Sequence, residues 1–480
     1  MFICESLERR GNDTCVLLAT AITVGFVCVS LAETTAVTQD FATDPNWDGR
    51  NNVRMEQGRE KKQDFGFSQT NHAGGGIGEI GGSVCRSVKP ATYSVAIEPK
   101  TLDDQLKASG RFNVTHSEGG SGLLVGWFNS TSRGWRTPNA LFMRIDGESN
   151  SFRIFYEYGT QNWKTGGGQT FEGMYQTNPS SKIPVGGKPH EWSIEYDPDG
   201  AEGRGEIALT LDGEVFKAPL DEGHKADGAT FDRFGIMNQQ IYGDHLTAYF
   251  DDITIDGKRF DFAADPKWEG AGNRDTFSDI AIRPHHDFGH RPTNFAGGEP
   301  GEIGGFIWRI ESVDPEHAGY YGAPTGRLTM NDKLTASGKV SFRRAAVDCG
   351  LLIGWFNSHT AIGAPPNNFV GVLVEGPSRI GHYFRPVYGA SDDQRGIQDE
   401  GPIFNPDGKQ RTWSVVYDPD ANAGHGRITA TLDGESVDMD LPETARKGNA
   451  VFDRFGIVSW QRGGHYVEMY FDDITYTAAE

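Results

Sequence analysis

The chain has 480 residues, of which 37% are hydrophobic, 11% aromatic and 23% charged, as is typical of a soluble globular protein. Its net charge of -21, with no basic block, argues against nucleic acid as a partner, because such binding needs clustered Lys and Arg. The 63 glycines favour strands joined by tight turns over long helices.

The N-terminus has the pattern of a targeting segment. Arg9 and Arg10 precede an apolar stretch over 15–31, and small residues at 30 and 32 suit cleavage by a signal peptidase. We therefore expect residues 1–32 to be a signal peptide and the mature protein to be secreted, periplasmic or on the cell surface, with no membrane span after cleavage. The alternative is a retained anchor, because the stretch is close to the lower limit of about 17 residues for a span.

The rest of the chain contains one sequence pattern twice in the same order. DFATDPNW at 40–47 returns as DFAADPKW at 261–268, and LLVGWFNS at 123–130 returns as LLIGWFNS at 351–358. Such self-similarity indicates a duplicated structural unit. We predict one domain over 39–258 and a second over 259–480, with no linker between them.

Alternation of apolar and polar residues dominates within each copy. Residues 151–158 alternate over their whole length, and 206–211 and 427–432 each run into an Asp-Gly hairpin signal. Many short strands with regular turns predict an all-β two-sheet sandwich or jelly roll.

The segment from Trp192 through Asp197-Pro198-Asp199 to Asp212-Gly213, closed by the strand at 249–253, resembles the C-terminal strands of concanavalin A-like lectin/glucanase jelly rolls. This superfamily includes legume lectins, laminin G-like modules and laminarinase-type glycoside hydrolases. The resemblance implies two tandem concanavalin A-like jelly-roll β-sandwiches, with a glycan on the concave sheet or its rim. Neither copy contains the Glu-x-Asp-x-x-Glu strand of the laminarinase-like enzymes, so the simplest catalytic assignment is missing.

Two carboxylates that recur in both copies are candidates for a structural Ca²⁺ site. Glu79 lies in Gly-Glu-Ile-Gly-Gly, which returns around Glu302, and Asp251 lies in the last strand of the first copy. The resemblance implies Ca²⁺ near the last strand, and hard oxygen ligands suit this ion. The alternative is that Glu79 caps backbone amides and that Asp251 is hydrogen-bonded or solvated.

Residues found in only one copy are the candidates for ligand binding. Glu157 aligns with Val387 and His72 with Phe295, which makes Glu157 and His72 the candidate catalytic residues. The candidate ligand-binding residues of the first copy, chosen as aromatic, Arg and Asn side chains that suit sugars, are Asn129, Trp135, Arg136, Arg144 and Trp163. Ordinary surface divergence after duplication would give the same pattern. Hydrolysis would need a second carboxylate, for which Asp146 and Glu172 are guesses.

Two further sets remain open. His285, His286 and His290 could bind a transition metal or be solvated loop residues. Cys85 and Cys349 could pair or be single buried thiols.

The predicted function is therefore that of an extracytoplasmic carbohydrate-binding protein that recognises a polysaccharide or glycoconjugate. The alternative is a secreted glycoside hydrolase or polysaccharide lyase with its site in the first copy. A protein-binding adhesion module is a weaker third reading.

Overall fold

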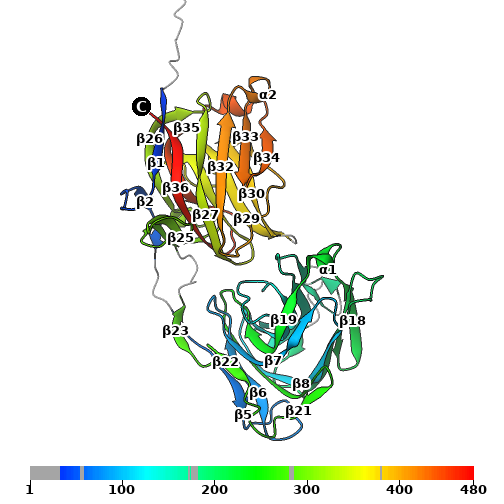
Figure 1. The fold of residues 1–480 in the computed structure, drawn as a ribbon. Helices are drawn as coiled ribbons and strands as arrows, with labels where there is room; N and C mark the ends of the chain where they lie inside the picture. The colour runs from blue at the N-terminus through cyan, green and yellow to red at the C-terminus, as the bar shows by residue number, and fades with distance from the viewer. Residues whose placement is uncertain (1–32, 55–58, 171–172, 175–181, 280–285, 379–380) are drawn as a thin grey trace, which may run out of the picture. The chain divides into compact units, whose positions relative to one another are not determined.

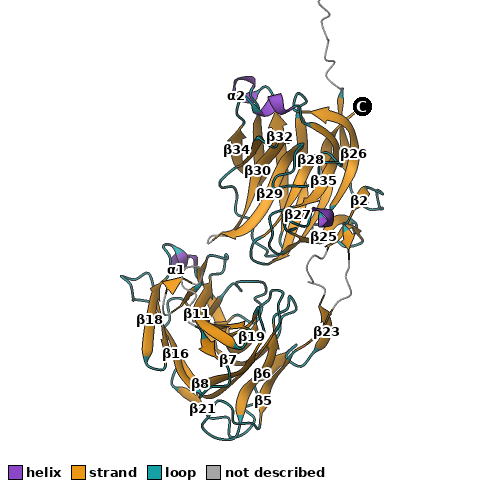
Figure 2. Cartoon of the chain, turned by 180° about the vertical axis from the view of Figure 1, so that it is seen from behind, coloured by secondary structure: helices purple, strands orange, loops and turns teal. Residues whose placement is uncertain are grey.

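The structure is a computed structural model that describes residues 33–480 except 55–58, 171–172, 175–181, 280–285 and 379–380. The predicted signal peptide lies outside the described residues. Strands dominate the described chain and form two β-sandwiches (Figures 1 and 2). The described helical turns are short: α1 (His224–Asp227), α2 (Ala421–Gly424) and 3₁₀ turns at Pro315–His317 and Ala445–Gly448. The predicted all-β class and its two-sheet sandwiches are confirmed.

Sandwich one consists of two sheets, named here after their central strands. The β20 sheet runs β18 (Glu214–Pro219), β17 (Glu206–Leu211), β16 (His190–Asp197), β8 (Leu106–Ser117), β20 (His245–Ile255), β6 (Glu79–Cys85), β5 (Asp64–Ser68), with β21 (Lys258–Phe260) also on β20. The β9 sheet runs β12 (Thr165–Gly167), β11 (Ser151–Gly159), β10 (Ala140–Glu148), β9 (Ser121–Phe128), β19 (Thr230–Asn238), β7 (Thr92–Thr101), β22 (Glu269–Ala271), with β15 (Ile183–Pro184) on β11.

Sandwich two repeats this arrangement. The β36 sheet runs β3 (Val53–Arg54), β24 (His286–Arg291), β25 (Glu302–Trp308), β36 (Tyr466–Ala479), β27 (Leu334–Ala345), β32 (Gln410–Asp418), β33 (Arg427–Leu432), β34 (Glu435–Asp440), with β1 (Thr34–Gln39) on β36. The β28 sheet runs β2 (Asp48–Arg50), β26 (Tyr320–Thr329), β35 (Val451–Ser459), β28 (Cys349–Phe356), β29 (Phe369–Ser378), β30 (Gly381–Ser391), β31 (Gln394–Ile397). Two small ribbons pair β4 (Arg59–Lys62) with β23 (Thr276–Asp279) and β13 (Gln169–Thr170) with β14 (Gly173–Met174).

Each core follows from the two-residue period of its strands. In β9, Leu123, Val125 and Trp127 enter the core between the sheets, whereas Leu124 and Phe128 belong to a separate cluster on the outer face. The predicted hairpin turns are also present. Asp212 and Gly213 both have positive φ, 48° and 88°, as a two-residue turn between β17 and β18 requires.

The opening segments of the two repeats complete each other's sandwich. β1 pairs with β36 and β2 with β26, so Phe41 and Trp47 are core residues of sandwich two. β22 pairs with β7, and Phe262 and Trp268 are core residues of sandwich one.

The pairing therefore differs from the sequence-based division at 39–258 and 259–480. The reason is local: Asp256 and Gly257, with φ of 45° and 86°, turn the chain back so that β21 pairs with β20. The residues that follow stay on sandwich one, and the first strands of the chain fill the equivalent place in sandwich two.

The Gly-Glu-Ile-Gly-Gly motif makes room for this exchange. A Cβ on Gly78 would lie 1.9 Å from the carbonyl oxygen of Phe262, and one on Gly301 would lie 2.0 Å from that of Phe41. Both glycines also have φ above +100°, a region that L side chains rarely adopt. The close backbone approach at these two glycines is thus made by the exchanged segment.

Cys85 and Cys349, the cysteines within the described residues, are buried single thiols. The disulfide alternative is therefore wrong for Cys85 and Cys349, which lie in different sandwiches. No helix among the described residues has the length and apolar character needed to cross a membrane.

Candidate functional site

The outer face of the β9 sheet in sandwich one carries most of the polar residues that distinguish the two copies. The core side of β10 holds Leu141, Met143 and Ile145, so Arg144 and Asp146 point to the outer face. Glu157 on β11 points the same way and lies opposite Phe142 of β10.

These residues form a buried ionic cluster. Arg144 bridges the carboxylates of Glu157, at 2.6 Å, and Asp146, at 3.1 Å. Asp146 also accepts hydrogen bonds from Arg86 and, at 3.0 Å, from Gln239. Glu157 is only 3% exposed, and Arg144 is its buried ion-pair partner.

The electrostatics of this cluster do not suit acid–base catalysis. Burial disfavours the charged form of Asp146, but Arg144 and Arg86 outweigh burial and hold the pKa of Asp146 below its ordinary value. A general acid for glycoside hydrolysis needs a raised pKa. Asp146, one of the two suggested second carboxylates, shares the partner Arg144 with Glu157 but stays ionised. Glu172, the other suggestion, lies outside the described residues.

Sandwich two keeps half of this cluster. Glu375 occupies the place of Asp146 and pairs with Arg309, the counterpart of Arg86, and with Arg385. Val387 replaces Glu157, as aligned from the sequence, and Leu373 replaces Arg144. Both of these belong to an apolar cluster on the outer face.

On the same outer face, at its β7 and β19 side, lies a pocket of about 240 Å³, and the apolar residues Leu124 and Met237 lie between it and the ionic cluster. The residues that line this pocket include Thr92, Ser94, Phe128, Arg133, Arg233 and Glu269. β7 supplies the two hydroxyl residues, β19 supplies Arg233, and the loop after β9 supplies Arg133. The pocket is therefore formed by rigid strands on one side and a connecting loop on the other.

The loop of this pocket is held by side chains of the repeated sequence. Ser130 donates its backbone N–H and its hydroxyl to Asp232, at 2.7 and 2.6 Å. Asn129 accepts the backbone N–H and the hydroxyl of Thr131, at 3.0 and 2.6 Å. Asn357 and Ser358 make the equivalent contacts in sandwich two. This asparagine therefore positions the loop in both copies, and we assign Asn129 to the loop and not to a ligand.

Sandwich two fills the equivalent space with hydrophobic side chains. Tyr320 stands where sandwich one has Thr92, and its ring centroid lies 5.2 Å from that of Phe356. Ala361 stands five residues after Phe356, as Arg133 does after Phe128, and it is buried against Phe356. The pocket is thus a feature of sandwich one.

The structure does not bring Glu157 and His72 together. His72 follows β5 and lies over the outer face of the β20 sheet, where its ring stacks on Tyr249 with a centroid separation of 4.3 Å. Glu157 lies on the outer face of the other sheet of the sandwich. Since the core separates the two faces, these residues cannot act on one substrate atom.

The other predicted residues are near the pocket's face but are mostly packed. Arg136 donates to the hydroxyl of Thr165 at 2.9 Å, and Trp163, in the turn between β11 and β12, is only 9% exposed. Trp135 is half-buried in the loop after β9. Of the predicted ligand-binding residues, Trp163 is too covered to offer a stacking face, and Trp135 offers part of one.

Glu79 and Asp251 are bonded within the protein. Both oxygens of Glu79 accept backbone N–H groups, from His72 at 2.9 Å and from Ala73 at 2.8 Å, as Glu302 does in sandwich two. Asp251 accepts the N–H of Asp252 at 2.7 Å. The amide-capping alternative for Glu79 is what the geometry fits. Calcium binding stays a prediction.

The histidines of sandwich two are used in packing. His286 is fully buried, with its Nε2 3.1 Å from the carbonyl of His317, and His290 lies 2.9 Å from the carbonyl of Phe41. His285 lies outside the described residues. The described part of the chain contains no group of three His, Cys, Asp or Glu side chains placed to hold a metal.

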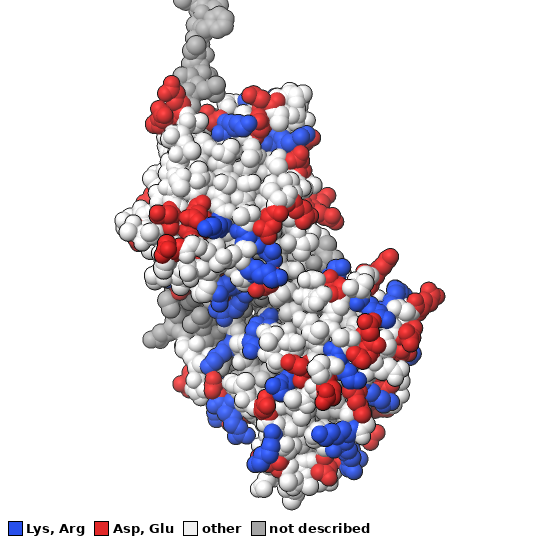
Figure 3. Space-filling view, viewed as in Figure 1, with Lys and Arg blue, Asp and Glu red and all other residues white. Residues whose placement is uncertain are grey.

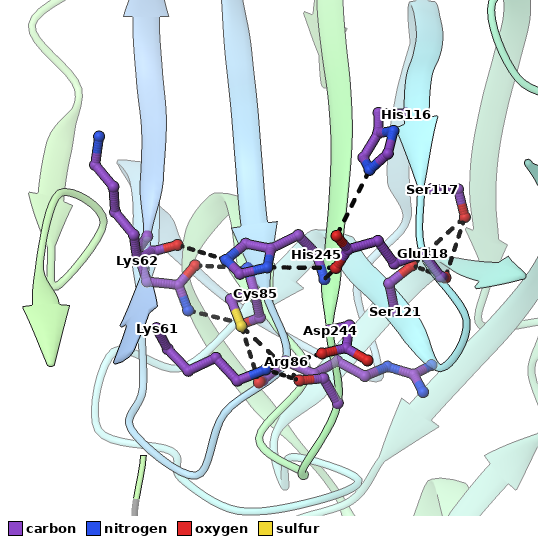
Figure 4. Close-up of polar contacts among 12 residues, drawn as sticks. Lys61, Lys62, Cys85, Arg86, His116, Ser117, Glu118, Ser121, Asp244 and His245 are labelled. Carbon is purple, nitrogen blue, oxygen red and sulfur yellow. Dashed lines mark hydrogen bonds and ion pairs between the residues drawn. The ribbon is translucent and has the colours of Figure 1, made fainter. Parts of the chain in front are cut away.

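A second polar cluster lies at the start of β20 in sandwich one (Figure 4). Lys61 of β4 donates to the carbonyl of Gly243 at 2.7 Å and to Asp244 at 2.9 Å. Burial opposes the charge of Lys61, but the hydrogen bond that Lys61 donates to Asp244 raises the pKa of Lys61 overall. Glu118 lies between His245 and His116, at 3.5 and 3.7 Å. Because these contacts tie β4, β8 and the adjoining turns to the start of β20, we interpret the cluster as structural.

Sequence reasoning missed the pocket residues Arg133, Arg233, Thr92 and Ser94. A signal was present in the repeat, since Thr92 aligns with Tyr320 and the position of Arg133 holds Ala361. The candidates were large groups present only in the first copy, whereas the pocket arises because Thr92 is smaller than Tyr320.

No family model matches the chain, and a search of curated proteins finds no match either. Among solved structures, domains LG4-5 of the mouse laminin alpha1 chain are similar, with 12% identity, 82% of this chain and 87% of that chain covered, and a TM-score of 0.23. Peanut lectin with a nine-residue peptide matches at 13% identity, 40% and 90% coverage, and a TM-score of 0.25. The lectin from Bauhinia forficata in complex with GalNAc matches at 14%, 41% and 89%, and 0.24. These laminin and legume lectin structures belong to the groups named in the sequence resemblance.

Proposed function

We propose that the protein is an extracytoplasmic carbohydrate-binding protein whose ligand site is the Thr92–Arg133–Arg233 pocket of sandwich one. The observation that carries this proposal is the contrast between the copies. The pocket is open and lined by hydroxyl and guanidinium groups in sandwich one, whereas Tyr320, Phe356 and Ala361 fill it in sandwich two. Polar groups at the rim of a pocket with an aromatic base suit a sugar ring and its hydroxyls.

The location rests on the predicted signal peptide. A protein exported in this way would meet polysaccharides or glycoconjugates outside the cytoplasm. Nucleic acid is a poor alternative, because the net charge is -21 and Asp and Glu accompany Lys and Arg over sandwich one on the face drawn in Figure 3.

Binding is favoured over turnover by the state of the candidate carboxylates. Glu157 is neutralised by Arg144, and the neighbouring arginines lower the pKa of Asp146. Asp146 is therefore not poised to donate a proton to a leaving group, and the carboxylate of Glu157 is occupied by its ion pair with Arg144. His72, the other catalytic candidate, lies on the opposite sheet.

The test is to incubate residues 33–480 with a panel of polysaccharides and to follow both depletion on the insoluble polymers and release of reducing or unsaturated ends. We expect retention on at least one polysaccharide without product. Release of ends that stops in Glu157→Gln would overturn the proposal in favour of an enzyme.

A further inference from the structure

The pocket of sandwich one holds positive charge that the protein does not balance. Arg133 is exposed and donates its Nη1 to two backbone carbonyls, of Ser130 at 2.9 Å and of Ser132 at 2.6 Å. Among the described residues no carboxylate lies within ion-pair distance of Arg133. Its guanidinium therefore keeps a full charge and several free N–H donors at the mouth of the pocket.

Arg233 adds a second, partly used guanidinium. Its Nη2 pairs with Glu269 at 3.0 Å, but its Nη1 is buried and has no hydrogen-bond partner. A buried donor without a partner costs about 1–3 kcal/mol. A ligand acceptor that reached this atom would remove that cost.

In sandwich two, which lacks the pocket, the arginine equivalent to Arg233 has protein partners for all its nitrogens. Arg454, the counterpart of Arg233, donates Nε and Nη2 to Asp48, at 3.0 and 2.7 Å, and Nη1 to the carbonyl of Asp453 at 2.9 Å. All three nitrogens of Arg454 are used. The position of Arg133 is taken by the buried Ala361. The unused donors are thus specific to the copy that has the pocket.

We infer that this pocket selects a glycan bearing an anionic substituent, either the carboxylate of a uronic acid or a sulfate ester. This inference rests on the proposed function and names its substrate class. Two guanidinium groups offer parallel N–H donors that match the oxygens of a carboxylate or sulfate, and such charge-assisted bonds are about twice as strong as neutral ones. Thr92 and Ser94 remain for the sugar hydroxyls.

The overall charge of the protein sharpens the inference. At a net charge of -21 the molecule repels a polyanion at long range, so a general electrostatic attraction cannot explain a preference for acidic glycans. Any such preference must come from the local donors of the pocket.

The experiment measures the affinity of residues 33–480 for matched pairs of ligands by calorimetry. Oligogalacturonate is compared with its methyl ester, and dextran sulfate with dextran, so that the carboxylate and sulfate arms are separate. We expect one acidic member to bind at least 10-fold more tightly than its neutral partner. Arg133→Gln should abolish that preference, and Arg133→Lys should restore part of it. Arg259→Gln, which removes an exposed charge on the other sheet, should leave the preference intact.

Three results are informative. Loss of the acidic preference in Arg133→Gln alone would support the inference. Equal binding of acidic and neutral members, unchanged by Arg133→Gln, would overturn the inference and leave the carbohydrate-binding proposal standing. If neither these pairs nor the polysaccharide panel binds the folded protein, the proposed function itself fails, and the inference with it.

Discussion

The two sandwiches share a scaffold but differ on the outer face of one sheet. Both keep the exchanged opening segment, the amide-capping Glu79 or Glu302, and an arginine–carboxylate pair at Arg86 or Arg309. Only sandwich one has the extra Arg144–Glu157 pair and the polar pocket. The comparison shows which repeated residues maintain the fold and which positions were free to change towards binding.

The largest expected effect concerns the exchanged segment. Trp47→Ala should destabilise sandwich two by about 3–5 kcal/mol, because a large core ring is removed from among Phe41, Tyr321 and Tyr476. Hydrogen exchange resolved by peptide would locate the loss.

The matched control is Trp268→Ala, which should weaken sandwich one by a similar amount. Loss of protection in sandwich one on changing Trp47 would mean that the first segment belongs to the first repeat, as the sequence-based boundaries have it.

The next effect concerns the buried ion pair of sandwich one. Glu157→Val alone should lower the free energy of unfolding by about 3 kcal/mol, since it removes a buried partner of Arg144. Adding Arg144→Leu, the residue pair of sandwich two, should recover much of that loss. Urea unfolding of the single and double variants measures both changes; equal stability of wild type and Glu157→Val would contradict a structural role.

Filling the pocket should remove binding with little effect on stability. Thr92→Tyr combined with Ser94→Gly copies Tyr320 and Gly322 of sandwich two, and a ring would then occupy the space above Phe128. We expect affinity for the retained polysaccharide to fall at least 10-fold, which is about 1.4 kcal/mol. The reverse change in sandwich two, Tyr320→Thr, should leave binding unaltered, and a fall there would place the ligand elsewhere.

The smallest expected effect concerns Asp472 in β36, the last strand of sandwich two. Burial, and then the neighbouring Asp473 and Glu302, raise the pKa of Asp472 to about 6. The folded state therefore binds this proton more tightly than the unfolded state, and stability falls as pH rises from about 4 to about 6. Asp472→Asn should raise the free energy of unfolding by about 1 kcal/mol at pH 8 and by nothing at pH 4. A constant difference between the two pH values would show that the charge of Asp472 is not responsible.

The sequence predicted the fold well because a two-residue period and Asp-Gly turns are local signals. The strands at 151–158, 206–211 and 427–432 and the turns at Asp212 and Asp433 are where the pattern put them. The exchange of opening segments was missed because strand pairing is non-local. The turn at Asp256 and Gly257 folds β21 back on β20, but no local pattern marks which sandwich the residues after β21 join.

The site was predicted only in part. Arg144 and Glu157 were both selected as candidate residues of the first copy, but their mutual pairing depends on the register of β10 against β11. His72 was grouped with them because copy-specific residues carry no information about which sheet they occupy. The pocket was not predicted from the sequence, because it depends on the small side chain of Thr92, which leaves space where sandwich two has Tyr320.

The most direct test is a hydrogen-exchange footprint of residues 33–480 with and without a saturating amount of the polysaccharide fragment that the panel identifies. The account predicts new protection in sandwich one at the start of β7 and in the loop that carries Arg133, with sandwich two unchanged. Protection confined to the Tyr320 and Phe356 face of sandwich two would contradict it.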